Sequence, residues 1–127
     1  MITIQIEPAE AFDRFSILTV KYFNLQDNNG DIQLLEKVKN ELQTLSNQIS
    51  SSISMPRTQE IVDSEEYNDL LKINEKLFNL FNECKKGGMD ALIPDEYNWK
   101  RHLAKKTLQK KFFNEDFNEV KLGYNAK

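Results

Sequence analysis

An apolar stripe near the start of the chain constrains its fold more than any other feature. Apolar residues recur there at steps of four, three, four and three, the spacing of one face of a helix. A stripe this continuous must be buried against partner elements. Segment 8–26 is therefore predicted to be a helix that ends at the break 27–30. Its core side is formed by Ala11, Phe15, Leu18, Tyr22 and Leu25.

Two later segments carry the same spacing. One is predicted to begin at Asp31, a suitable N-cap, and to end before Pro56, which disfavours helix in the preceding residue. The other begins after the N-cap candidate Ser64 and ends at the glycine pair 87–88. A fourth helix is expected over 95–114, and 57–63 is expected to be a loop. The core positions are Leu35, Val38, Leu42, Leu45 and Ile49, then Tyr67, Leu70, Asn74, Leu77 and Phe81.

The first residues follow a different pattern. Ile2, Ile4 and Ile6 alternate with polar residues, which predicts a short strand or an extended arm. The helical stripes that follow are joined by short connections, which favours antiparallel neighbours. We therefore expect residues 1–127 to form one all-α domain, an antiparallel helical bundle of about four helices with a short N-terminal extended arm or strand. A homodimer that completes the bundle is an alternative that this pattern leaves open.

Composition excludes several classes of protein. A single cysteine among 127 residues allows neither an internal disulfide nor a multi-cysteine zinc site. No apolar run approaches the roughly 20 residues of a membrane span, and the N-terminus does not resemble a secretory signal. No glycine-rich phosphate loop occurs. We expect a cytoplasmic protein that does not contact a membrane.

The charges are distributed unevenly. Residues 1–84 carry 7 Lys or Arg against 14 Asp or Glu, and residues 85–127 carry 10 against 6. Segment 99–113 is basic and interleaved with aromatic residues, so it could track phosphate groups. It could instead pack on the bundle while its cations reach the acidic first half. The sequence pI of about 5.2 favours the second interpretation. The six cations are Lys100, Arg101, Lys105, Lys106, Lys110 and Lys111.

The first helix also carries charged residues beside its stripe. Asp13 and Lys21 lie two turns apart, roughly 12 Å along the axis, and so do not pair with each other. They are interpreted as surface charges that flank the core. The alternative is that Asp13 and Lys21 line a polar patch or cleft between helices.

Asn74 stands where an apolar residue would pack better. A buried amide needs hydrogen-bond partners, and polar residues at such positions often fix register or oligomeric state. We expect this structural role for Asn74, with contact to a ligand as the alternative.

An acidic cluster lies before and within the start of the third helix. Clustered carboxylates can bind magnesium, but acidic residues at a helix N-terminus are also favoured by the helix dipole. The second explanation is preferred. The sole histidine, His102, lacks a partner arrangement for catalysis and is expected at or near the surface. The cluster comprises Glu60, Asp63, Glu65, Glu66 and Asp69.

The run from Asp13 to Lys21 resembles the opening signature of a domain-of-unknown-function family of small helical proteins from phages and bacteria. The step Ile73-Asn74 and the ending 119–124 resemble that family as well. Residues 104–107 depart from it, because the family tends to Asn-Asp-Arg-Ala there. The resemblance implies a helical bundle and a phage or bacterial setting, with host cytoplasm as the location if a phage encodes it. It implies no activity.

The sequence thus favours a non-enzymatic helical binding or interaction protein with a protein partner, for example a phage accessory protein that engages a host or virion protein. One alternative is a binder of phosphate-rich ligands, nucleotide or nucleic acid, through 99–113. Another is a magnesium-dependent nucleotide phosphohydrolase. No catalytic residue, metal ligand or cofactor is predicted. The candidate ligand- or partner-binding residues are Asp13, Arg14, Lys21, Asn74, Lys100, Arg101, Lys105, Lys106, Lys121 and Tyr124.

Overall fold

Five helices account for the regular structure of the described residues. The computed structural model describes the chain except residues 1, 3–4, 29, 86–91 and 116–127. The all-helical prediction is confirmed. The predicted N-terminal strand lies partly outside the described residues, and Ile2 and residues 5–7 are not in a strand. The helices are α1 (Pro8–Asp27), α2 (Ile32–Ile53), α3 (Met55–Val62), α4 (Glu65–Lys85) and α5 (Leu92–Phe113).

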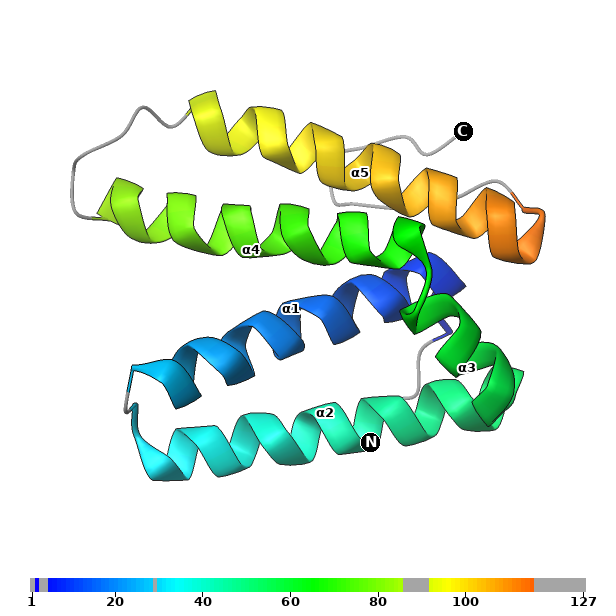
Figure 1. Cartoon of the computed structure of the whole chain (residues 1–127), viewed down its shortest axis with the longest axis horizontal. Coiled ribbons are helices and arrows are strands. Elements are labelled where there is room, and N and C mark those ends of the chain that lie inside the picture. Colours follow the sequence, from blue (N-terminus) through cyan, green and yellow to red (C-terminus); the bar gives the residue numbers. More distant parts are fainter. Residues whose placement is uncertain (1, 3–4, 29, 86–91, 116–127) are drawn as a thin grey trace.

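The long helices form two hairpins that meet along α1. α1 and α2 run in opposite directions, as do α4 and α5, whereas α1 and α4 run in the same direction (Figure 1). α1 contacts α2, α4 and α5, so it lies between the two hairpins. The short helix α3 connects them at one end, where it contacts both α2 and α4.

The expected loop over 57–63 is wrong, because most of it belongs to α3. Ser54 ends α2 and also caps α3, with φ of 87° and its Oγ accepting from the Arg57 N–H at 3.3 Å. Pro56 then occupies the first turn of α3, where its missing N–H costs nothing. The proline that was expected only to stop one helix therefore also starts the next.

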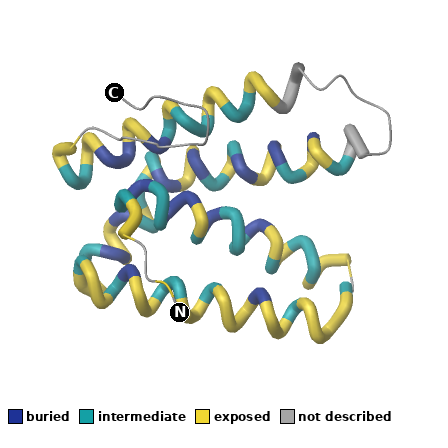
Figure 2. The backbone as a smooth tube through the Cα atoms, turned by 180° about the vertical axis from the view of Figure 1, so that it is seen from behind, coloured by how far each residue is buried: buried dark blue, intermediate teal, exposed yellow. Residues whose placement is uncertain are grey.

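The predicted stripe on α1 is only half-buried. The fully enclosed residues lie on an adjacent face, because α1 is covered on one side by α2 and on the other by α4 and α5. α2 is largely exposed, and Val38 and Ile49 are its buried residues (Figure 2). The buried residues of α1 are Ala9, Phe12, Asp13, Ser16 and Val20.

The core lies where α1, α3, α4 and α5 meet, and Ile49 of α2 also belongs to it. The ring of Tyr67 on α4 contacts Phe12 edge-on, with 6.1 Å between centroids, and Ile61 of α3 and Leu108 of α5 are completely buried beside them. Phe81 was expected in this core but is 46% exposed. Phe81 lies toward the C-terminal end of α4, where α1 and α4 diverge (Figure 1).

Candidate functional site

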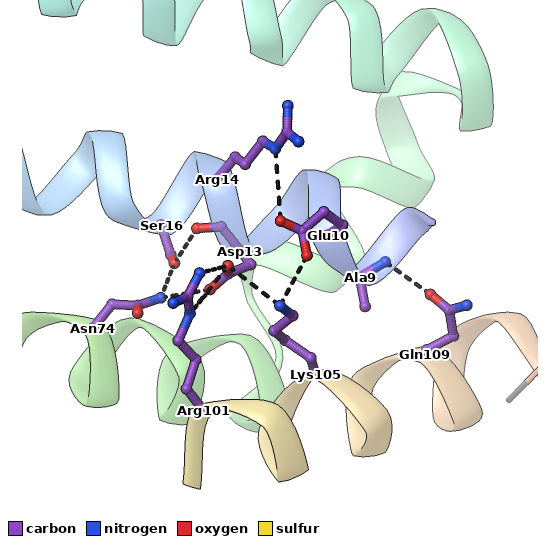
Figure 3. A network of polar contacts seen from close by, with 9 residues as sticks. All are labelled: Ala9, Glu10, Asp13, Arg14, Ser16, Asn74, Arg101, Lys105 and Gln109. Carbon is purple, nitrogen blue, oxygen red and sulfur yellow. Dashed lines mark hydrogen bonds and ion pairs between the residues drawn. The ribbon is translucent and has the colours of Figure 1, made fainter. Parts of the chain in front are cut away.

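A buried carboxylate lies at the contact between α1, α4 and α5 (Figure 3). Asp13 is fully buried, and its Oδ1 and Oδ2 accept from Nε of Arg101 at 2.9 and 3.1 Å. Nη2 of Arg101 also donates to Oδ2, and Nζ of Lys105 lies 3.7 Å from the same oxygen. A carboxylate is costly to remove from water unless cations and donors compensate it, as they do here. The interpretation of Asp13 as a surface charge is therefore wrong.

Asn74 brings α4 to the same carboxylate. Its Nδ2 donates to Oδ1 of Asp13 at 2.9 Å and to Oγ of Ser16 at 2.6 Å. The Ser16 hydroxyl in turn donates to the backbone oxygen of Asp13 at 2.7 Å. Asn74 is 5% exposed, so the polar residue within the apolar stripe of α4 is buried, as its spacing predicted.

Lys105 is the second buried charge of the site. Its Nζ lies 2.8 Å from Oε2 of Glu10, and the residue is 1% exposed. Nε of Arg14 lies 3.6 Å from the other oxygen of Glu10, and the Arg14 side chain is exposed. The long aliphatic stem of Lys105 is thus covered by the bundle while its ammonium meets carboxylates of α1.

Gln109 extends the contact to the first turn of α1. Glu7, the N-cap of α1, makes no side-chain cap hydrogen bond. Instead, the N–H of Ala9 donates to Oε1 of Gln109 at 2.8 Å, and Nε2 of Gln109 donates to Oε2 of Glu7. One of the free N–H groups at the start of α1 is therefore satisfied from a helix about 100 residues away.

Arg101, Lys105 and Gln109 are spaced four residues apart, so they form one row along α5, here named the α5 polar row. This row meets α1 in the reverse order, first at Asp13, then at Glu10 and finally at Ala9. Such paired polar contacts would be lost if either helix slid or rotated. The arrangement therefore fixes the register of α5 on α1, which is a structural task.

The remaining cations of α5 lie outside that row. Lys111 reaches Glu66 of α4, with 3.0 Å from Nζ to Oε2, and this hydrogen bond lowers the pKa of the Glu66 carboxyl. Lys100 stands over the ring of Tyr97, 4.4 Å from its centroid. Lys106 and Lys110 are exposed.

The acidic cluster is spread along α3 and the start of α4. Arg57 donates to Glu60 at 3.0 Å, and Nε2 of Gln59 donates to Asp63 at 3.0 Å. Among the residues that the structure describes, no three His, Cys, Asp or Glu side chains gather as a metal site would require. Most carboxylates of this cluster are exposed, and they lie near the end of α3 and the start of α4.

Several sequence candidates lie away from the buried site. Lys21 is exposed on α1, and Lys121 and Tyr124 lie outside the described residues. His102 is half-buried and stacks on Trp99, with 5.4 Å between ring centroids. Sequence reasoning named Asp13, Asn74, Arg101 and Lys105 but missed Glu10 and Gln109. The four-residue spacing of Gln109 from Lys105 was the signal that could have found it.

A separate cleft of about 260 Å³ lies between α1 and α4 where the two helices diverge. Its walls include Phe23 and Asp27 of α1 and Glu75 and Phe78 of α4. None of the described sequence candidates lines it, and the buried site around Asp13 is distinct from it.

No described helix is long and apolar enough to cross a membrane. Comparisons with protein-family models, with curated proteins and with solved structures found no match to this chain. The resemblance of 13–21 to a domain-of-unknown-function family therefore stays a prediction.

Proposed function

We propose that this chain is a non-enzymatic interaction protein whose partner is another protein. The observation that carries the proposal is the exposure of large apolar side chains on the α4–α5 hairpin. Trp99 is 62% exposed, Phe81 46% and Leu103 43%. Aromatic side chains supply much of the energy of protein interfaces, and leaving them in water is unfavourable.

The contacts of the buried site support a structural use of its charges. Asp13 and Glu10 face Arg101 and Lys105 inside the fold, and Asn74 adds a further hydrogen bond. These groups are engaged by one another at the junction of three helices. A catalytic centre would instead need such groups at a cavity that a substrate can enter.

Two alternatives from the sequence are less favoured. A binder of phosphate-rich ligands would use the cations of α5, but Arg101, Lys105 and Lys111 face carboxylates of this chain. A magnesium-dependent phosphohydrolase would use the acidic cluster, in which Glu60 and Glu66 already face Arg57 and Lys111. We assign no catalytic residue, metal ligand or cofactor.

The arrangement of the helices and the N-terminal arm are also part of this proposal. We propose that α1, α2, α4 and α5 act as one antiparallel bundle and that a short extended arm precedes α1. The cytoplasmic location and the phage or bacterial setting are proposed on the sequence alone. A homodimer stays an alternative to a different protein partner.

The proposal is tested by recovering the partner. The tagged full chain is purified from its own cells, and the co-purifying protein is produced separately and titrated by calorimetry. We expect saturable binding with a Kd of about 1 μM or tighter, worth roughly −8 kcal/mol. Recovery of nucleic acid or a nucleotide as the bound species, with no protein that binds on titration, would overturn the proposal.

A further inference from the structure

The outward side of α5 carries a second row of residues. Trp99, Leu103, Lys106 and Lys110 follow one another at steps of four, three and four, so they lie along one face of the helix. All four are exposed. We name these four residues the outer row of α5. It lies opposite the buried Leu108, which is nine residues after Trp99 and therefore half a turn away from it.

The two rows of α5 differ in what their cations face. In the α5 polar row, Arg101 and Lys105 meet Asp13 and Glu10. In the outer row, neither Lys106 nor Lys110 forms an ion pair within the part of the chain that the structure describes. Among the described residues, the fold thus compensates the inner charges, while the side chains of the outer lysines are exposed.

The two halves of the outer row differ in chemistry. Its first half is apolar, with Trp99 held against the His102 ring at 5.4 Å between centroids, and its second half is cationic. Asp95 and Glu96 are exposed about one turn before Trp99. Positive charge is therefore confined to the C-terminal half of the row, beyond Leu103.

We propose that the outer row of α5 docks an acidic amphipathic helix of the partner protein. This inference rests on the proposed function and names its surface and the chemistry of its partner. The apolar side of the partner helix covers Trp99 and Leu103, and its carboxylates meet Lys106 and Lys110. Charge complementarity of this kind steers association and fixes orientation.

The chemistry of the row favours a protein over a polyanion. A nucleic acid gains affinity from many phosphate contacts, whereas this row offers two lysines, and the acidic residues Asp95 and Glu96 precede it. An anionic membrane would find one tryptophan and one leucine to insert, which is little apolar area.

Trp99 is the only tryptophan of the chain, so its fluorescence reports directly on this face. The full chain is titrated with a peptide of about 18 residues, five helical turns, that carries Leu on one face and Glu on the other. The same peptide with Lys in place of Glu, phosphatidylglycerol vesicles and a single-stranded oligonucleotide are titrated separately. We expect the acidic peptide alone to shift the Trp99 emission to shorter wavelength and to bind saturably by calorimetry.

A matched pair of variants locates the binding. Lys106→Glu combined with Lys110→Glu should weaken binding of the acidic peptide at least about tenfold, or 1.4 kcal/mol. Lys37→Glu combined with Lys39→Glu makes the same charge change on exposed positions of α2 and should change binding less than about twofold. The circular dichroism of both variants checks that they fold.

The outcomes separate the inference from the proposed function. The acidic peptide could bind without shifting the Trp99 emission and bind equally strongly to both double variants. This result overturns the inference but not the proposed function. Failure of the acidic peptide to bind at all also overturns the inference, and the recovery of a native protein partner then decides the proposed function. A Trp99 shift with vesicles or oligonucleotide, and none with the peptide, overturns both.

Discussion

The side-chain amide of Asn74 on α4 lies 2.9 Å from a carboxylate oxygen of Asp13 on α1, across 61 residues of sequence. The same carboxylate accepts from Arg101 on α5. One buried acidic group therefore ties three helices together. Asp13 on α1 is thus where a neutral amide of α4 and two cations of α5 meet.

Replacement of Asp13 by Asn should strongly destabilise the fold. The change keeps the shape of the side chain but leaves Arg101 and Lys105 without the carboxylate they share. Breaking a buried ion pair by removing one partner costs roughly 3–5 kcal/mol. Urea unfolding measures the loss. The control Asp27→Asn lies at the exposed end of the same helix and should cost less than about 0.5 kcal/mol. Equal effects of the two variants would contradict the structural role of Asp13.

Gln109→Ala should loosen the start of α1. The change removes the acceptor of the Ala9 N–H and leaves that buried group unpaired, at a cost of about 1–3 kcal/mol. Hydrogen exchange should show faster exchange of the Ala9 amide than in the parent chain. Gln48→Ala on the exposed face of α2 serves as the matched control. Unchanged exchange at Ala9 would mean that another group satisfies this N–H.

Tyr67→Phe should raise stability. Among the described residues, the buried Tyr67 hydroxyl has no hydrogen-bond partner, so its removal relieves a penalty of about 1 kcal/mol. Burial raises the pKa of this phenol above its usual value, and the Asp13 carboxylate adds to the shift.

The raised pKa of Tyr67 also predicts a pH dependence. Because the folded state holds its proton more tightly, the parent chain should lose stability as the pH rises above about 10, where the unfolded phenol ionises. The advantage of Tyr67→Phe should therefore grow between pH 9 and 11, roughly one unit on either side of that value. Thermal unfolding at several pH values measures it. A constant difference across that range would contradict the prediction.

Ser54→Gly should be stabilising, which is unusual for a change to glycine. Ser54 adopts φ of 87° and ψ of 155°, a conformation that only glycine accepts without strain of about 1–3 kcal/mol. Loss of the hydrogen bond from the Arg57 N–H to the Ser54 side chain costs only a few tenths of a kcal/mol when glycine replaces the capping serine. We expect a net gain of about 1 kcal/mol by urea unfolding. Ser51→Gly, in helical conformation three residues earlier, should instead lose about 0.5 kcal/mol.

The starts of α1, α2 and α4 could be predicted because their signals are local, whereas α5 begins at Leu92, before the predicted start at 95. Pro8 begins α1, and Asp31 caps α2 through its Oδ1, which accepts from the Gln33 N–H at 2.8 Å. Ser64 likewise accepts from the N–H of Tyr67 at 3.1 Å at the start of α4. Each signal operates within a few residues, so it is readable without knowledge of the fold. α3 was missed because Pro56 fits both the end of one helix and the beginning of another.

The candidate site could be predicted only in part, because its contacts join distant segments. The sequence indicated that Asn74 is buried, but nothing local to Asn74 identifies Asp13 as its partner. The basic segment was expected to send cations to the acidic half, as Arg101 and Lys105 do. Which cations turn inward depends on how α5 is rotated, and packing of Leu108 in the core sets that rotation.

One paired measurement tests the account most directly. It asks whether the α5 polar row stabilises the fold while the outer row of α5 binds a partner. The free energy of unfolding and the Kd for the acidic amphipathic peptide are measured for Lys105→Ala and for Lys106→Ala combined with Lys110→Ala. Lys105→Ala should lose roughly 3 kcal/mol of stability while its folded form binds the peptide within about twofold of the parent chain. The outer double variant should keep its stability within about 0.5 kcal/mol per substitution and lose at least about tenfold in affinity. A Lys105→Ala variant of unchanged stability, or an outer double variant of unchanged affinity, would contradict the account.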